Sequence, residues 1–228
     1  MRLVSPIKLE FLVRLSGREG QPMHSALRFA KTAYIESHHL KPLISSYTNP
    51  DDLISRMVKT GELIRLKNGF FLIREKIESA PVPYEQIANL LYGPSYISFE
   101  WALSYYNMIP EGVYVVTSAS ASKSKTYDTS IGTFDYTYLN HHRYAIGIDQ
   151  QENSAGKFLI ATPEKALADL VHLKSKKLKG KDLLLDLVEA RRMDEDALKS
   201  LNKRHLIEIA DHYRSTTVTN LINVLGMV

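Results

Sequence analysis

Cysteine is absent from this chain of 228 residues. Its absence excludes disulfide bonds and thiolate metal sites, and it fits a reducing compartment. The 11 glycines are scattered and form no glycine-rich phosphate-binding loop. Long apolar runs are also missing, because charges interrupt residues 1–20, MRLVSPIKLEFLVRLSGREG, every few positions. We therefore expect no signal peptide and no membrane span, and we predict a cytoplasmic protein.

Charge is unevenly distributed along the chain. Residues 1–80 carry 13 Lys or Arg against 8 Asp or Glu, whereas residues 81–228 carry 16 against 17. The positive excess, formally +4 for the whole chain, therefore comes entirely from the first third. Such an excess favours an anionic partner for this part, most often nucleic acid.

Residues 49–60, NPDDLISRMVKT, have the signals of a capped helix. Asn49 is a good N-cap, and Pro50 suits the first helical position. Gly61 suits the left-handed residue that ends many helices. The apolar positions recur at helical spacing and form one stripe: Leu53, Ile54, Met57 and Val58. The opposite side carries polar residues: Ser55, Arg56, Lys59 and Thr60.

A β-hairpin is predicted directly after this helix. Asn68-Gly69 is the strongest two-residue hairpin signal, because both positions tolerate positive φ. A two-residue loop pairs Lys67 with Phe70 and Arg65 with Leu72, and paired residues share a face of the sheet. We therefore expect an apolar face with Ile64, Leu66, Phe71 and Ile73, and a charged face with Arg65, Lys67 and, one pair further along, Arg74.

The residues upstream complete a recognisable order of elements. Residues 25–40 are predicted to form a helix, and residues 40–48 a shorter one. Helix, short helix, capped helix and charged hairpin is the order of a winged helix-turn-helix. In that motif one helix enters the major groove of DNA, and the hairpin, or wing, lies along the adjacent backbone. We therefore predict a winged helix DNA-binding domain over residues 1–80.

Residues 78–86, ESAPVPYEQ, contain two prolines and predict a linker. Beyond it we expect a mixed α/β domain with a helical C-terminal part over residues 81–228, so the whole chain is predicted to be α+β. The expected helices cover residues 84–92, 95–109, 163–173, 181–191, 194–201 and 203–213. The expected strands cover residues 112–120, 132–140, 143–148 and 157–161.

The predicted helix and hairpin offer what DNA recognition needs. Base edges are read by short hydrogen-bonding groups and arginines, and cations hold the phosphates. We predict that Ser55 and Arg56 contact bases. The other predicted DNA-binding residues are Lys59, Thr60, Arg65, Lys67, Asn68 and Arg74, of which the cations are assigned to phosphates. The alternative is a solvated basic surface over a core; Asp51 and Asp52 favour it slightly, because they would repel a phosphate.

Several blocks of the sequence resemble a known family. The block LISRMVKTGELIRLKNGFFLI is similar to the N-terminal winged-helix part of the AbiEi-type antitoxins of abortive-infection (type IV toxin–antitoxin) systems. Three later blocks are similar as well: PSYISFEWALSYYNMIPEGVYVVTSAS, GTFDYTYLN and ATPEKALADLVHL. The resemblance spans residues 40–215 and depends on the order and spacing of these blocks. The first forty residues are longer than a minimal winged helix needs.

The resemblance implies a transcriptional autorepressor and antitoxin without catalytic activity or cofactor. It implies that the N-terminal domain binds inverted repeats of double-stranded DNA in its own promoter. It further implies that the C-terminal domain counteracts a nucleotidyltransferase-type toxin, without a stable complex being required. Palindromic operators call for two copies on DNA, which is compatible with a monomer in solution.

Other functions stay open. One is a protein–protein adaptor whose winged helix is only structural. Another is a nuclease using Glu164, Lys165 and Asp169, but residues 164 and 169 are five apart and face each other poorly on a helix. We expect Glu164 to complement the helix N-terminus and Asp169 to lie on the solvent-facing side.

Further features favour structural roles. Adjacent histidines, His38-His39 and His141-His142, point to different sides of a helix or strand, so no metal site is expected. The lysine run over residues 174–181 and the Ser/Lys stretch over residues 118–126 are expected to be solvated loops. The aromatic residues Phe99, Trp101, Tyr105 and Tyr106 indicate a helix core more than a platform for stacking bases.

Overall fold

The computed structural model describes residues 24–226 except 111 and 176. The chain is α+β and divides into two compact units, Met1–Ile87 with Asp128–Gly132, and Ala88–Tyr127 with Thr133–Val228. None of the helices within the described ranges is long and apolar enough to cross a membrane.

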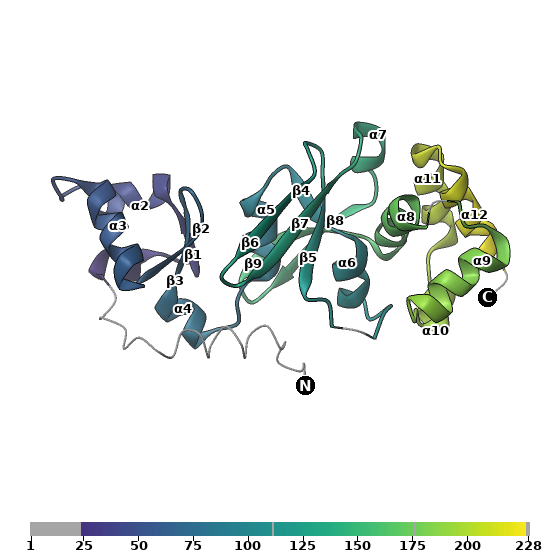
Figure 1. Cartoon of the computed structure of the whole chain (residues 1–228), viewed down its shortest axis with the longest axis horizontal. Helices are drawn as coiled ribbons and strands as arrows, with labels where there is room; N and C mark the ends of the chain where they lie inside the picture. The colour runs from purple at the N-terminus through teal and green to yellow at the C-terminus, as the bar shows by residue number, and fades with distance from the viewer. Residues whose placement is uncertain (1–23, 111, 176, 227–228) are drawn as a thin grey trace. The chain divides into compact units, whose positions relative to one another are not determined.

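The first unit combines short helices with a three-stranded antiparallel sheet of order β1-β3-β2 (Figure 1). Its elements are η1 (Ser25–Phe29), β1 (Tyr34–Glu36), α2 (Ser37–Leu43), α3 (Pro50–Thr60), β2 (Leu63–Lys67), β3 (Phe70–Ile73) and α4 (Arg74–Ser79). Helices and sheet share one core, to which Leu27, Ile35, Leu40, Met57, Leu63 and Phe71 all contribute. Burying each large apolar side chain contributes roughly 1.5–3 kcal/mol, which holds α3 against the sheet.

Helix α3 is as predicted, but the helix expected over residues 25–40 is wrong. That range contains the 3-10 helix η1, the strand β1 and the start of α2. Ile35 is buried and pairs with Phe71 of β3. Pairing with a strand almost forty residues away therefore overrides the local helical spacing. Pro42 lies inside α2.

The second unit is built on a six-stranded mixed sheet of order β6-β7-β5-β4-β9-β8. Its strands are β4 (Ser95–Ile97), β5 (Val115–Ser120), β6 (Lys125–Thr129), β7 (Gly132–Tyr138), β8 (Ile148–Asn153) and β9 (Gly156–Ala161). Its helices are α6 (Phe99–Tyr105), α7 (His141–Tyr144), α8 (Pro163–Lys174), α9 (Gly180–Leu185), the π-helix η2 (Asp186–Ala190), α10 (Glu195–Lys199), α11 (Lys203–Tyr213) and α12 (Thr216–Leu225). Helix α5 (Tyr84–Leu91) spans the division between the units, and so do the end of β6 and the first residue of β7.

Helix α8 lies at the centre of the helical part of this unit. It packs against α6, α11 and α12, and its residues 164–171 are all buried. Thr162 caps α8 by accepting a hydrogen bond from the Lys165 backbone N–H at 3.3 Å, as the Thr-Pro signal predicts. Because this helix is covered on all sides, it has no solvent-facing side along residues 164–171.

Some predictions for this unit are wrong. Residues 95–97, expected to be helical, form strand β4, which pairs with β5 and β9. Residues 143–148, expected to be a strand, contain the end of α7, a bend and only the first residue of β8. Strands β6 and β8, at the two edges of the sheet, were not predicted because their sequences are mostly polar.

Candidate nucleic-acid interface

Helix α3 is fixed at both ends by its own residues. Asn49 Oδ1 accepts a hydrogen bond from the Asp52 backbone N–H at 3.4 Å, and its amide donates to Asp52 Oδ2 at 2.6 Å. At the other end Gly61 has φ +85° and closes the last turn. The apolar stripe of Leu53, Ile54 and Met57 is buried. The rotation of α3 about its own axis is therefore fixed, and its polar side points away from the core of the first unit.

The polar side of α3 is open to solvent. Ser55, Arg56 and Lys59 are exposed, and neither cation makes an ion pair with a residue that the structure describes. Thr60 is half-buried, and its single hydroxyl proton is shared between two acceptors, the Met57 carbonyl at 3.2 Å and Glu62 Oε1 at 3.1 Å. Arg56 and Lys59 are thus available to an anion, whereas the Thr60 hydroxyl already has hydrogen-bond partners within the first unit.

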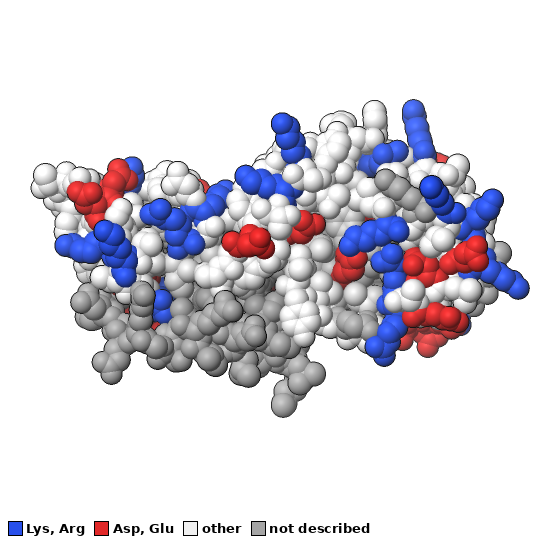
Figure 2. Space-filling model, in the orientation of Figure 1, with Lys and Arg blue, Asp and Glu red and all other residues white. Residues whose placement is uncertain are grey.

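Acidic residues lie only at the beginning of α3. Asp51 and Asp52 are exposed there, and Lys41 of α2 forms an ion pair with Asp51 at 2.9 Å. Figure 2 shows blue side chains gathered over the region that α3 and β2 occupy in Figure 1, with red side chains at the start of α3. Asp52 lies four residues, about one helical turn, before Arg56 and seven residues before Lys59, and the half-buried Glu62 follows Lys59 by three residues.

The hairpin β2–β3 differs from the predicted register. Lys67 pairs with Phe70, as expected, but Arg65 pairs with Phe71 and not with Leu72. A β-bulge between Arg65 and Lys67 inserts Leu66 as an extra residue, so the prediction is wrong from Leu66 onward. The bulge adds twist and turns Arg65 and Lys67 onto different faces of the sheet.

Aromatic rings hold both cations of the hairpin. The Arg65 guanidinium lies 5.5 Å from the centre of the Phe71 ring, and Lys67 Nζ lies 5.8 Å from the centre of the Phe70 ring. Such contacts orient a cation without neutralising its charge. Asn68 is exposed at the tip of the hairpin. The hairpin thus presents polar groups at its tip and along its outer strand.

Arg74, predicted to bind a phosphate, makes contacts inside the first unit. Its Nε donates to the Gly61 carbonyl at 2.5 Å, and its Nη1 lies 3.7 Å from Glu78 Oε1. Its side chain is only 14% exposed. Arg74 therefore joins the end of α3 to the start of α4, and its predicted contact with a phosphate stays a prediction.

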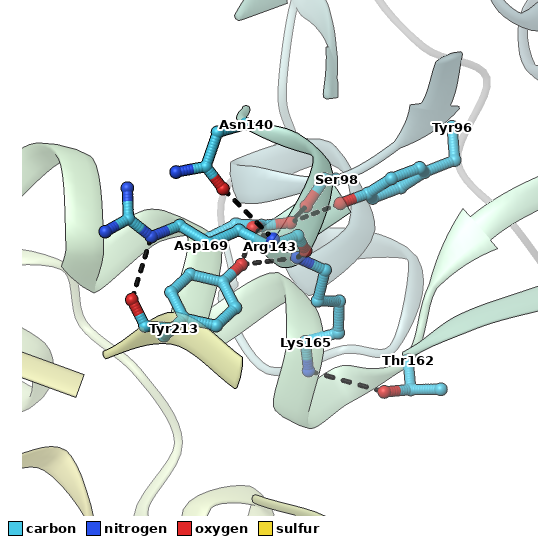
Figure 3. A network of polar contacts seen from close by, with 8 residues as sticks. All are labelled: Tyr96, Ser98, Asn140, Arg143, Thr162, Lys165, Asp169 and Tyr213. Atoms are coloured by element: carbon cyan, nitrogen blue, oxygen red, sulfur yellow. Dashed lines mark hydrogen bonds and ion pairs between the residues drawn. The ribbon is translucent and has the colours of Figure 1, made fainter. Parts of the chain in front are cut away.

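A second polar group of residues lies inside the second unit (Figure 3). Asp169 Oδ1 accepts hydrogen bonds from Lys165 Nζ at 2.8 Å and from the Tyr213 hydroxyl. Its Oδ2 accepts hydrogen bonds from the Ser98 hydroxyl at 2.6 Å and from the Tyr96 hydroxyl at 3.3 Å. We call these five residues the Asp169 network.

The Asp169 network is closed and buried. Lys165 Nζ also donates to the Arg143 carbonyl at 2.6 Å. Burial lowers the pKa of the Lys165 ammonium, an effect that Asp169 opposes, and burial raises the pKa of Tyr213. The sequence prediction that Asp169 lies on a solvent-facing side is wrong. The missed signal was the spacing of four between Lys165 and Asp169, which aligns them on one face of α8.

The remaining nuclease candidate, Glu164, is also engaged. It is buried, its Oε1 accepts a hydrogen bond from the Asn202 backbone N–H at 2.8 Å, and its Oε2 lies 3.4 Å from His205 Nδ1. Glu164 therefore joins α8 to α11, and both carboxylates of α8, Glu164 and Asp169, have partners within the second unit.

Comparison with known proteins supports the fold. No family model matches the chain, and no curated protein matches it either. Among solved structures, the crystal structure of the Rv2827c protein from Mycobacterium tuberculosis is similar to it, with a TM-score of 0.55 and 10% sequence identity. The match covers 89% of this chain and 75% of that one. At this identity the likeness concerns the fold alone.

Proposed function

We propose that this protein is a DNA-binding transcriptional autorepressor and the antitoxin of a type IV toxin–antitoxin system. In this proposal the first unit is a winged helix-turn-helix in which α3 reads the major groove and the β2–β3 hairpin is the wing. The order η1, β1, α2, α3, β2 and β3 supports it, because a strand before two helices and a hairpin after them build one small sheet under the reading helix.

One observation carries the DNA-binding part. Helix α3 is anchored by Leu53, Ile54 and Met57, while Arg56 and Lys59 project from its other side without an acidic partner in the described parts of the chain. A cation that is already paired must break its ion pair before it binds a phosphate. The unpaired cations of α3 avoid that cost and release counterions from DNA directly.

The antitoxin part is supported by the resemblance of the sequence blocks to AbiEi-type antitoxins. In this part of the proposal, the second unit counteracts a nucleotidyltransferase-type toxin. The proposal includes no catalytic step, and the internal partners of Glu164 and Asp169 are consistent with that. The two functions are separable, so each needs its own experiment.

The DNA-binding part is tested with the full chain and the DNA upstream of its own gene. Fluorescence anisotropy would compare this DNA with a scrambled duplex of the same length over a salt series. We expect tighter binding to the native DNA and a log–log salt slope that reflects several phosphate contacts. Equal, weak binding to both duplexes would contradict the proposal, and capture of a protein partner in its place would support the adaptor alternative.

The antitoxin part is tested by growth. Expression of a nucleotidyltransferase encoded beside this gene should arrest cells, and co-expression of this chain should restore growth. Double substitution of Arg56 and Lys59 by Ala should abolish repression of the promoter and leave rescue intact. Loss of rescue in this variant would contradict a division of the two roles between the two units.

A further inference from the structure

Three potential metal ligands converge where β1 passes into α2. They are Glu36, which ends the strand, and His38 and His39, which lie in the first turn of the helix. One ligand atom from each of the three lies within 4.8 Å of the others. Glu36 Oε2 lies 3.0 Å from His38 Nδ1, and the centres of the two imidazole rings are 3.9 Å apart. The expectation that adjacent histidines point apart is therefore wrong here.

The backbone holds this junction in place. Glu36 pairs with Phe70 of β3, and the Ser37 backbone N–H donates to the Gly69 carbonyl at 2.8 Å. Leu40, one turn into α2, is fully buried. The segment that carries the three ligands is thus attached to the hairpin on one side and to the core on the other. The change from strand to helix at Ser37 is what brings a strand carboxylate beside two helix imidazoles.

We propose that Glu36, His38 and His39 form a binding site for a divalent first-row transition metal such as Zn²⁺. Two imidazoles and one carboxylate are a ligand set that zinc accepts, with a fourth position open to water or another ligand. Imidazole nitrogens disfavour Mg²⁺ and Ca²⁺, which take oxygen ligands.

The distances fit an ion after small movements of side chains. Bonds of about 2.0–2.1 Å in tetrahedral geometry separate ligand atoms by roughly 3.4 Å, which lies between the observed 3.0 Å and the 4.8 Å limit. His38 and His39 are exposed, so their rings are able to rotate and the ion has a path from solvent.

The site lies beside the predicted wing. Glu36, Phe70 and Lys67 are paired in register across β1, β3 and β2, so their side chains share one face of the sheet. Two strand spacings separate Glu36 from Lys67, about 10 Å, which is about one Debye length at 0.1 M salt. A bound ion adds two positive charges there and strengthens attraction of the wing to phosphates. This effect depends on the proposed function, whereas metal binding itself does not.

Metal binding is tested on the full chain by calorimetric titration with ZnCl₂ and by the visible absorption of bound Co²⁺. We expect one site in the wild type and loss of that site in the double variant His38→Ala/His39→Ala. Loss of a residue that only hydrogen-bonds to a metal ligand already lowers metal affinity roughly 10- to 100-fold. Because Glu36 is proposed as a direct ligand, Glu36→Gln should lower the affinity for Zn²⁺ by at least this much. These residues are half-buried or exposed, so circular dichroism should show an unchanged fold.

The matched control is the other adjacent histidine pair. His141 and His142 lie in α7 with ring centres 5.9 Å apart, and the variant His141→Ala/His142→Ala should bind Zn²⁺ like the wild type. Equal Zn²⁺ binding by the wild type and the His38/His39 variant would overturn the site.

The effect on DNA is measured separately, by the same anisotropy assay with and without Zn²⁺. Zn²⁺ should raise affinity for the upstream DNA in the wild type and not in the His38/His39 variant. If Zn²⁺ binds and this affinity is unchanged, the metal site stands and its effect on DNA is overturned. If Zn²⁺ binds and no DNA binding is found at any salt concentration, the proposed function fails and the metal site still stands.

Discussion

Lys165 Nζ and Asp169 Oδ1 lie 2.8 Å apart, and both side chains are completely shielded from solvent. Around this ion pair Tyr96 comes from β4, Ser98 from the start of α6 and Tyr213 from α11. The Asp169 network therefore connects the six-stranded sheet to the C-terminal helices through one carboxylate. In such a network, removal of any one partner leaves a buried polar or charged group unpaired, which is strongly destabilising.

Replacement of Asp169 by Ala should destabilise the protein by about 3–5 kcal/mol, because it leaves the Lys165 ammonium buried without its partner. Urea unfolding followed by circular dichroism measures the loss. The matched control is the exposed i,i+4 pair of Glu195 and Lys199 in α10, separated by 3.9 Å. Lys199→Ala should cost less than about 1 kcal/mol. Equal effects of the two substitutions would contradict a structural role for the Asp169 network.

Replacement of Arg56 by Ala should weaken binding to the upstream DNA by about 1–3 kcal/mol, the usual contribution of one side chain that reads a base edge. Binding to scrambled DNA should change much less. Arg204, an exposed arginine of α11, provides the control, and Arg204→Ala should leave both affinities unchanged. An equal loss on native and scrambled DNA would assign Arg56 to phosphates.

Replacement of Lys67 by Ala should weaken binding to both duplexes alike. Loss of one phosphate contact should reduce the log–log salt slope by about 0.9. The same salt series measures this slope, with Lys203→Ala in α11 as the control for a lysine remote from the hairpin. A slope that does not change would remove the hairpin from the DNA interface.

Replacement of Gly61 by Ala should destabilise the first unit by about 1–2 kcal/mol, the cost of placing an L-residue in the left-handed region. Gly61 has φ +85°, and a Cβ there would also lie 3.0 Å from Arg74 Nη2. Chemical unfolding measures the cost. Gly112 has open space around its Cα and no positive φ, so Gly112→Ala should change stability by less than about 1 kcal/mol. Equal costs at both glycines would contradict the strain at the end of α3.

Stability should fall as the pH rises above 10, in part through Tyr84. Burial raises the pKa of Tyr84 to about 12, and its hydroxyl donates to the Ile131 carbonyl at 3.1 Å. Because the folded-state pKa exceeds the unfolded value of 10.0, this contribution is complete below pH 10 and is lost between pH 10 and 12. Urea midpoints over this range should fall less steeply for Tyr84→Phe than for the wild type. Identical slopes would show that Tyr84 ionises equally in both states.

Local signals predicted the elements that local chemistry determines. Helix α3 has an Asn cap, a proline at its first position and a terminal glycine, and all three act as expected. The Asn68-Gly69 turn placed the hairpin, and the apolar stripe of α3 predicted the exposure of Ser55, Arg56 and Lys59 but not the half-burial of Thr60. The bulge at Leu66 was not predictable, because Leu66 fits an apolar strand position in either register.

Elements that depend on distant partners were missed. β1 and β4 are each three residues long and exist because β3, β5 and β9 pair with them. The exposed part of the candidate interface followed from helical periodicity, but the inward contact of Arg74 with Gly61 depends on α4 meeting the end of α3. The proximity of Glu36 to two histidines likewise requires the strand-to-helix junction, which the predicted continuous helix lacked.

The position of β4 has a consequence for synthesis on the ribosome. Its neighbours are β5, which follows it closely, and β9, where Ile97 pairs with Ile160. Until Ala161 leaves the exit tunnel, one edge of β4 has no partner and exposes backbone that a second nascent chain could pair with. The three-stranded sheet is complete once Ile73 has emerged. A chaperone that holds nascent chains should therefore bind this protein mainly while residues 95–161 are being translated.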